Sequence, residues 1–108
     1  MSAVEIVNHL HAAALLDLTA APVVVRSVGF VESSLDRGSI GEYSISFLQA
    51  LPDDRGGVLI TNLNGQARTL GARLFGATSN MVIDQFNAAG ARSDGGRVYV
   101  QVFRFPTS

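Results

Sequence analysis

An all-β fold, an antiparallel β-sandwich with jelly-roll-like connections, is the fold class that the sequence predicts. Short stretches of alternating or β-branched apolar residues recur along the chain, and glycine, proline, asparagine or aspartate stands between them. They give about six to seven strands at the spacing expected of a sandwich. The chain has 108 residues, which suits one domain with its own core. We therefore expect residues 22–108 to form the sandwich and residues 1–21 to form an N-terminal arm.

The arm, MSAVEIVNHLHAAALLDLTAA, is rich in alanine and leucine and predicts a short helix through about Leu16. Ser2 supplies an N-cap, and Glu5 stands at the capping-box position three residues later. A helix this short is marginal in water by itself, so it must pack either on its own sheet or, as an attachment arm, on another protein. The side chains expected on the attachment side are Val4, Val7 and Leu10.

From Pro22 the pattern changes to β structure. β-Branched residues predict one long or two short strands over Val23–Val25 and Val28–Val31, and Glu32–Gly41 is polar and contains two glycines, which predicts a loop. The clearest strand follows, because Tyr43, Ile45 and Phe47 alternate with two serines.

The second half of the chain continues with turns and strands. Proline and glycine provide turn chemistry after residue 51, and Asn-Gly is a strong turn signal at residues 64 and 65. One segment, Leu70–Ala77, fits either a strand or a helical turn. The other predicted elements are a turn at Pro52–Asp54, strands over Val58–Leu63, Met81–Phe86 and Arg97–Phe105, and a loop over Asn87–Gly96.

The last strand, RVYVQVFRF, is apolar on both faces. Val98, Val100 and Val102 point to one side, where they can fill the core, and aromatic residues point to the other. The second face needs a cover, which is either the N-terminal segment of the same chain or another subunit. The composition, 47% hydrophobic and 16% charged, favours a subunit interface in so small a domain. The residues expected in that interface are Tyr99, Phe103 and Phe105.

Composition also excludes classes of function. The chain has no cysteine, which excludes disulfides, thiolate metal sites and cysteine nucleophiles. Its net charge is −1 and its eight basic residues, all arginine, are scattered, so we expect no nucleic-acid partner. No apolar run reaches the roughly 20 residues that span a bilayer, so we expect no membrane partner. The first residues lack the pattern of a signal peptide, which predicts a protein used without secretion.

No set of residues predicts catalysis or a cofactor. His9 and His11 would lie on different faces of a helix and could meet only in an extended arm. Asp53 and Asp54 follow a proline and fit a turn better than a carboxylate pair. We therefore expect no enzyme, no metal and no cofactor. A glycan site in the loops Glu32–Gly41 and Asn87–Gly96 is harder to dismiss, although their spacing identifies none.

Four motifs together resemble a β-rich module of tailed-bacteriophage fibre, spike and head-decoration proteins. In that family a G-x-Y-x-V-x-F strand precedes A-L/M-P-D, and an asparagine–glycine loop precedes a final V-x-V-x-V-F strand. Arg55–Gly56–Gly57 departs from the family's aromatic and alternating valines after the proline. The matching motifs are Gly41-x-Tyr43-x-Ile45-x-Phe47, Ala50-Leu51-Pro52-Asp53, Phe86-Asn87-x-x-Gly90-x-x-x-Asp94 and Val98-x-Val100-x-Val102-Phe103-Arg104.

The resemblance covers about Val24 to Phe105 and implies a homotrimer displayed on a virion. With only about 20 residues beyond the module, a capsid decoration or short head spike, anchored by residues 1–21 to the major capsid protein or another virion protein, fits better than a long fibre. The alternative is a tail-fibre tip that binds a receptor or a host-surface glycan. Localisation on a virion, after synthesis in a bacterial cytoplasm, follows from either reading.

Overall fold

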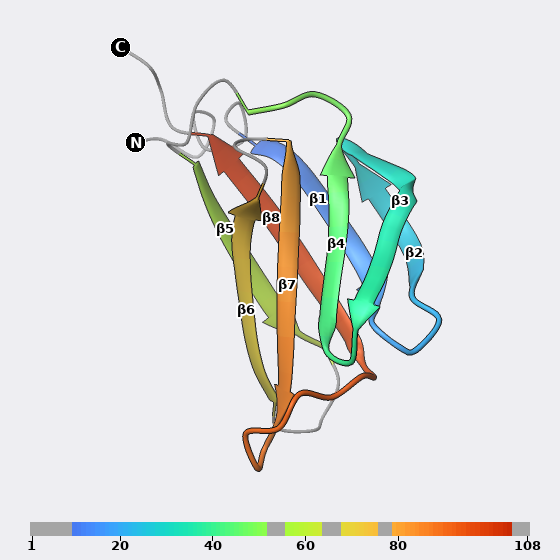
Figure 1. Ribbon diagram of the computed structural model, residues 1–108. Coiled ribbons are helices and arrows are strands. Elements are labelled where there is room, and N and C mark those ends of the chain that lie inside the picture. Colours follow the sequence, from blue (N-terminus) through green and yellow to red (C-terminus); the bar gives the residue numbers. More distant parts are fainter. Residues whose placement is uncertain (1–9, 52–55, 64–67, 76–78, 105–108) are drawn as a thin grey trace.

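The computed structural model describes residues 10–51, 56–63, 68–75 and 79–104, and these form a sandwich of two four-stranded antiparallel sheets. One sheet has the strand order β2-β1-β8-β5 and the other β3-β4-β7-β6. The two sheets lie face to face as two layers (Figure 1). The strands are β1 (Leu10–Asp17), β2 (Val23–Val28), β3 (Phe30–Ser39), β4 (Glu42–Phe47), β5 (Gly56–Asn62), β6 (Arg68–Phe75), β7 (Asn80–Asn87) and β8 (Arg97–Arg104).

The two sheets combine three local hairpins with three pairings between strands that are far apart in the chain. β1 pairs with β2, β3 with β4 and β6 with β7, each within one sheet. β1 and β5 both pair with β8, and β4 pairs with β7, so each sheet depends on pairings between strands that are far apart in the chain. The predicted sandwich is confirmed, with eight strands where about six to seven were expected. The three hairpins differ from jelly-roll connections, in which successive strands mostly change sheets.

The core lies between the inner faces of the four central strands. Because side chains alternate along a strand, every second residue of β1, β4, β7 and β8 points inward. Tyr43, Ile45 and Phe47 of β4 are buried, which confirms the clearest strand prediction. Val98, Val100 and Val102 of β8 are completely buried, as their alternation predicted. The opposing inward residues are Ala12, Ala14 and Leu16 of β1, and Met81, Ile83 and Gln85 of β7.

The predicted N-terminal helix is wrong over the residues that the structure describes. Leu10–Asp17 is strand β1, an inner strand hydrogen-bonded to β2 on one side and to β8 on the other. The sandwich therefore includes a strand from the segment predicted as an arm. Tertiary context outweighs the helix propensity of alanine and leucine here, because both edges of β1 have strand partners and its inner face is buried. Residues 1–9, with the predicted attachment residues Val4 and Val7, lie outside the described residues.

Two other predictions are revised by the structure. Most of the segment predicted as a polar loop is strand β3, an edge strand whose pairing with β4 is irregular between Val31 and Asp36. An edge strand tolerates polar residues because one side faces solvent. The ambiguous segment at residues 70–77 is a strand as far as residue 75, within β6. No described residue belongs to a helix that could cross a membrane.

Candidate interaction surface

The outer face of the β2-β1-β8-β5 sheet carries apolar side chains on all four strands, with Gln101 and Thr61 as its uncharged polar residues. The registers align its residues in transverse rows, and the central row crosses Val28, Ala13, Gln101 and Leu59 in turn. The neighbouring rows are Arg26, Leu15, Tyr99 and Thr61 on one side, and Leu10, Phe103 and Gly57 on the other. We call these eleven positions the outer apolar face.

An ion pair between neighbouring strands lies at one end of this face. Arg97 Nε lies 2.7 Å from Asp17 Oδ1, and the two residues are cross-strand partners in β8 and β1. The hydrogen bond from Arg97 holds the pKa of the Asp17 carboxyl below its usual value, although desolvation opposes this. In the rows of the outer apolar face itself, Arg26 is the single charged residue. This charge distribution separates an uncharged centre from a charged end.

The outer face of the other sheet is more polar, although Val82 and Phe86 of β7 also lie on it. On β4 it carries Ser44 and Ser46, and Ser46 Oγ donates a hydrogen bond of 2.6 Å to Asn80 Oδ1. Asp84 of β7 accepts from Arg73 at 3.3 Å and from Arg92 at 3.1 Å. Polar and charged side chains that already have partners are typical of a face in contact with water. The two outer faces of the sandwich therefore differ. Among the described residues, partnered polar side chains lie mainly on the outer face of the β3-β4-β7-β6 sheet.

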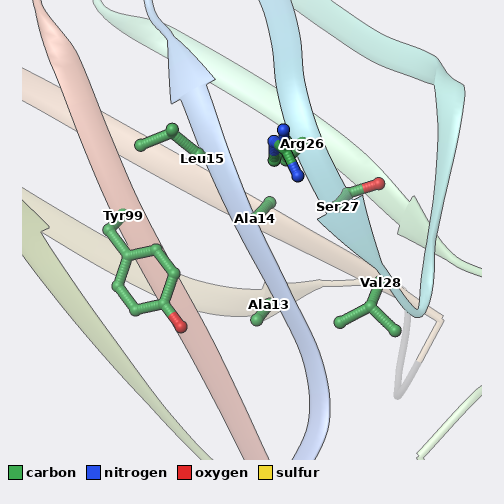
Figure 2. Close-up of a pocket in the computed structure, with 7 residues that line it drawn as sticks. All are labelled: Ala13, Ala14, Leu15, Arg26, Ser27, Val28 and Tyr99. Carbon is green, nitrogen blue, oxygen red and sulfur yellow. The ribbon is translucent and has the colours of Figure 1, made fainter.

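A shallow apolar hollow lies within the outer apolar face. Ala13 of β1 forms its floor, and Tyr99 of β8 and Val28 of β2 stand on either side of it (Figure 2). Leu15 and Arg26 complete the rim, and the hollow has a volume of about 340 Å³. It exists because a small side chain sits between larger ones in neighbouring strands. The Val28 side chain, which forms one wall of the hollow, is 62% exposed to solvent.

The structure places two of the three predicted interface residues on this face. Tyr99 and Phe103 are partly buried on the outer side of β8, as their alternation with the valines predicted. Leu10, predicted as an attachment residue, is the cross-strand partner of Phe103 and so belongs to the same face. Phe105 lies outside the described residues. Whether these positions contact another subunit stays a prediction.

Sequence reasoning missed the contribution of β1, β2 and β5 to this face. Ala13 and Leu15 alternate with inward Ala12, Ala14 and Leu16, so β1 is apolar on both faces, as β8 is. The signal was present in LHAAALLD, but an alanine- and leucine-rich segment also fits a helix. Leu59 was inside a predicted strand. Its 60% exposure could not be predicted, because the sequence did not show which side of β5 faces the core.

The two loops considered for a glycan site meet at one end of the sandwich. Arg37, from the first of them, forms an ion pair of 2.7 Å with Asp94, from the second. Asp94 Oδ1 also accepts hydrogen bonds from the Gly41 N–H at 2.9 Å and from the Tyr43 hydroxyl at 2.6 Å. Hydrogen bonds from Arg37 hold the pKa of Asp94 far below its usual value, while burial raises the pKa of Tyr43. These contacts hold the two loops together, and the polar atoms of Arg37, Tyr43 and Asp94 hydrogen-bond to one another.

A second polar group, around Arg68, joins the two sheets at the same end. Arg68 Nη1 donates to Gln85 Oε1 and to the Gly95 carbonyl, both at 2.6 Å, while Nη2 donates to Asn62 Oδ1 and to the Arg97 carbonyl. Gln85 Nε2 donates to the carbonyls of Ser93 and Gly95. All these acceptors are neutral, and desolvation lowers the pKa of Arg68. The arrangement ties β6 and β7 to β5 and β8 and presents no nucleophile.

Metal-binding groups do not gather in the described part of the chain. No three histidine, aspartate or glutamate side chains there lie close enough to hold an ion. His11 instead contacts the Gln49 carbonyl through Nε2 at 2.6 Å, and its ring packs edge-on against Phe47. The predicted turn aspartates at 53 and 54, and His9, are outside the described residues.

Comparison with known proteins adds no relative. The chain matches no protein-family model, and comparisons with curated proteins and with solved structures give no match either.

Proposed function

We propose that this chain is a structural subunit that assembles with copies of itself through the outer apolar face. The observation that carries the proposal is the contrast between the two sheets. One outer face holds partnered polar side chains beside the apolar Val82 and Phe86 of β7. The other has apolar side chains on all four strands, and Arg26 is its single charge. Contiguous exposed apolar surface of this kind marks an interaction site in soluble proteins.

The biological setting that we propose is a virion. The motifs around Tyr43 and in β8 resemble the tailed-bacteriophage module, which implies three copies in a capsid decoration or short head spike. A homotrimer would cover Tyr99 and Phe103 with neighbouring subunits. Anchoring to the major capsid protein or another virion protein would then fall to residues 1–9, because residues 10–17 form an inner strand.

The experiment that tests self-assembly is light scattering on the purified full chain. A mass of three subunits supports the proposal, and a monomer across the accessible concentrations refutes it. Phe103→Asp should give monomers or insoluble protein, because an ionised carboxylate cannot be buried unpaired in an interface. Thr69→Asp, on the outer face of the other sheet, is the matched control and should keep the wild-type mass. A soluble, intact oligomer from Phe103→Asp would contradict the assignment of this face.

The anchoring role requires a shorter deletion than the one the sequence suggested. Removing residues 1–21 would remove β1 and with it the core side chains of Ala12, Ala14 and Leu16. Removal of residues 1–8 leaves β1 complete, so the oligomer should persist while co-sedimentation with capsids is lost. Undiminished co-sedimentation would refute the anchor. A glycan array on the same two proteins tests the alternative, a receptor- or glycan-binding tip.

A further inference from the structure

The chain contains a single Asp-Gly pair, Asp94–Gly95, in the segment before β8. Such a pair is chemically labile, because the glycine nitrogen can attack the carboxyl group of the aspartate and glycine has no Cβ to hinder the approach. A bond forms between the Gly95 nitrogen and Asp94 Cγ, while the hydroxyl group of the acid and the amide proton leave as water. Water then opens the resulting succinimide ring, and opening at the main-chain carbonyl leaves isoaspartate.

The folded sandwich holds both reacting groups in other contacts. The Gly95 N–H donates a hydrogen bond to the Leu18 carbonyl, so the proton that must leave is held by the segment after β1. One oxygen of the Asp94 carboxylate accepts from the Gly41 N–H at 2.9 Å, and the other accepts from Arg37 Nη2 at 2.7 Å. Ring closure therefore requires the hydrogen bonds of both groups to break first.

Charge protects the pair in the same way. Ring closure requires the neutral carboxylic acid, since an ionised carboxylate has no hydroxyl group to lose as water. The hydrogen bonds from Arg37 lower the pKa of Asp94 and keep the carboxyl group ionised while the contact is intact. Both side chains are partly exposed, Asp94 at 19% and Arg37 at 28%, so their contact lies where the chain can open locally without unfolding of the core.

We propose that Asp94–Gly95 is a modification site, protected in the intact sandwich and converted to isoaspartate when the Arg37 contact opens. Isoaspartate lengthens the main chain by one carbon and shortens the carboxylate side chain by one, so the carboxylate no longer reaches Arg37 while Gly95 keeps its place. The Gly95 carbonyl, which accepts from Arg68 Nη1 and Gln85 Nε2, is displaced as well. The modification thus makes the opening permanent, and it is independent of the outer apolar face.

The test follows isoaspartate at residue 94 in the full chain by peptide mapping. Trypsin cleaves after Arg92 and Arg97 and so releases the site in one peptide, SDGGR, whose isoaspartate form has the same mass and separates by chromatography. The protein is incubated at about pH 6 in buffer and in guanidinium chloride. The peptide should isomerise readily in guanidinium chloride, where Asn64–Gly65 is the internal reference because it forms the same ring with loss of ammonia. In buffer the folded wild type should react far more slowly.

Two variants separate local opening from loss of global stability. Arg37→Ala releases the carboxylate and should speed isomerisation in buffer by a factor of about 5–30, the change in an opening equilibrium that one lost contact of this kind produces. Leu16→Ala is the control, because it destabilises the core and leaves the contacts of Asp94 in place. Urea unfolding shows whether each variant is folded, and Arg37→Lys replaces Arg37→Ala if the latter is not.

Three results would overturn the proposal. They are a folded wild type that reacts as fast as the protein in guanidinium chloride, an Arg37 variant that reacts no faster than Leu16→Ala, and a peptide SDGGR that does not isomerise in any sample. The isomerised protein, separated by ion exchange, should also have a lower Tm than the unmodified chain. An equal Tm would contradict the permanent opening.

Discussion

Asp94 holds one end of the sandwich together, so its replacement by alanine should destabilise the fold. The carboxylate accepts a hydrogen bond from Arg37 Nε that is shared between its two oxygens, one from Arg37 Nη2 at 2.7 Å, one from the Gly41 N–H and one from the Tyr43 hydroxyl. Its side chain is 19% exposed and that of Arg37 is 28% exposed. The segment before β8 is thereby fixed to the β3–β4 hairpin.

The cost of Asp94→Ala follows from these contacts. A hydrogen bond to a charged group contributes about 1.5–3 kcal/mol, but the contributions are not additive and partial exposure reduces them. Alanine leaves the Gly41 N–H without this acceptor and the Arg37 guanidinium without its carboxylate. We therefore expect a loss of about 3 kcal/mol in the free energy of unfolding, or a Tm lower by about 13 °C for a domain of this length. Asp94→Asn keeps one acceptor oxygen and should lose less.

The assay is urea unfolding followed by circular dichroism, with Asp36→Ala as the matched control. Asp36 is an exposed carboxylate on the same strand as Arg37, so its removal should change the free energy of unfolding by no more than about 0.5 kcal/mol. If Asp94→Ala is no less stable than Asp36→Ala, the network does not hold this end of the fold and the reasoning is refuted.

The pH dependence of the same variants gives a second readout. The pKa of Asp94 is lowered in the folded state by its hydrogen bonds from Arg37, with Tyr43 and Gly41 adding to the effect against desolvation. A carboxyl whose pKa falls on folding stabilises the fold above the unfolded pKa of about 3.9 and loses that contribution as the pH drops toward the folded pKa. The difference between wild type and Asp94→Ala should be constant from pH 7 to 5 and shrink below about pH 4. A difference unchanged down to pH 3 would contradict this.

Three further substitutions test other parts of the fold by thermal and urea unfolding. Gly41 and Gly90 both have positive φ, but a Cβ at Gly41 would lie 2.5 Å from a backbone carbonyl oxygen whereas one at Gly90 meets nothing within 4 Å. Alanine should therefore cost about 3 kcal/mol at Gly41 and about 1 kcal/mol at Gly90, and equal costs would refute the close approach. Leu16→Ala should cost about 2–5 kcal/mol because Leu16 is fully buried in β1, and a neutral result would favour an arm outside the core. Gly96→Ala should displace the Arg68 guanidinium that packs against it and lower the Tm, and an unchanged Tm would exclude that contact.

Strand β4 was predictable from the sequence because its environment matches its local pattern. Tyr43, Ile45 and Phe47 face the core and the serines face outward, so apolar and polar residues alternate along the strand in the sequence. The same holds for β8, whose inward valines were identified correctly and whose aromatic residues were assigned to the opposite face. For the outer apolar face, this alternation predicted the positions of Tyr99 and Phe103. It did not predict the residues of β1, β2 and β5 that lie beside them.

Strand β1 was not predictable in the same way. An inner strand that is apolar on both faces loses the alternation that would identify it, and LHAAALLD then resembles a helix by composition. β3 failed for the opposite reason, because a polar edge strand resembles a loop until its hydrogen bonds to β4 are known. Both errors came from strands whose surroundings are set by distant parts of the chain.

The sequence by itself determined an all-β sandwich, the positions of most strands and the apolar character of both faces of the last one, because strand periodicity and turn chemistry are local properties. Only the tertiary structure decided which strands are neighbours. The pairing of β1 with β8 and the ion pair of Arg37 with Asp94 join residues from distant parts of the chain. The outer apolar face exists only through such pairings, since its rows take one residue from each of four strands. The local pattern specifies which face of a strand is buried, but which distant strand lies beside it depends on the packing of the whole core.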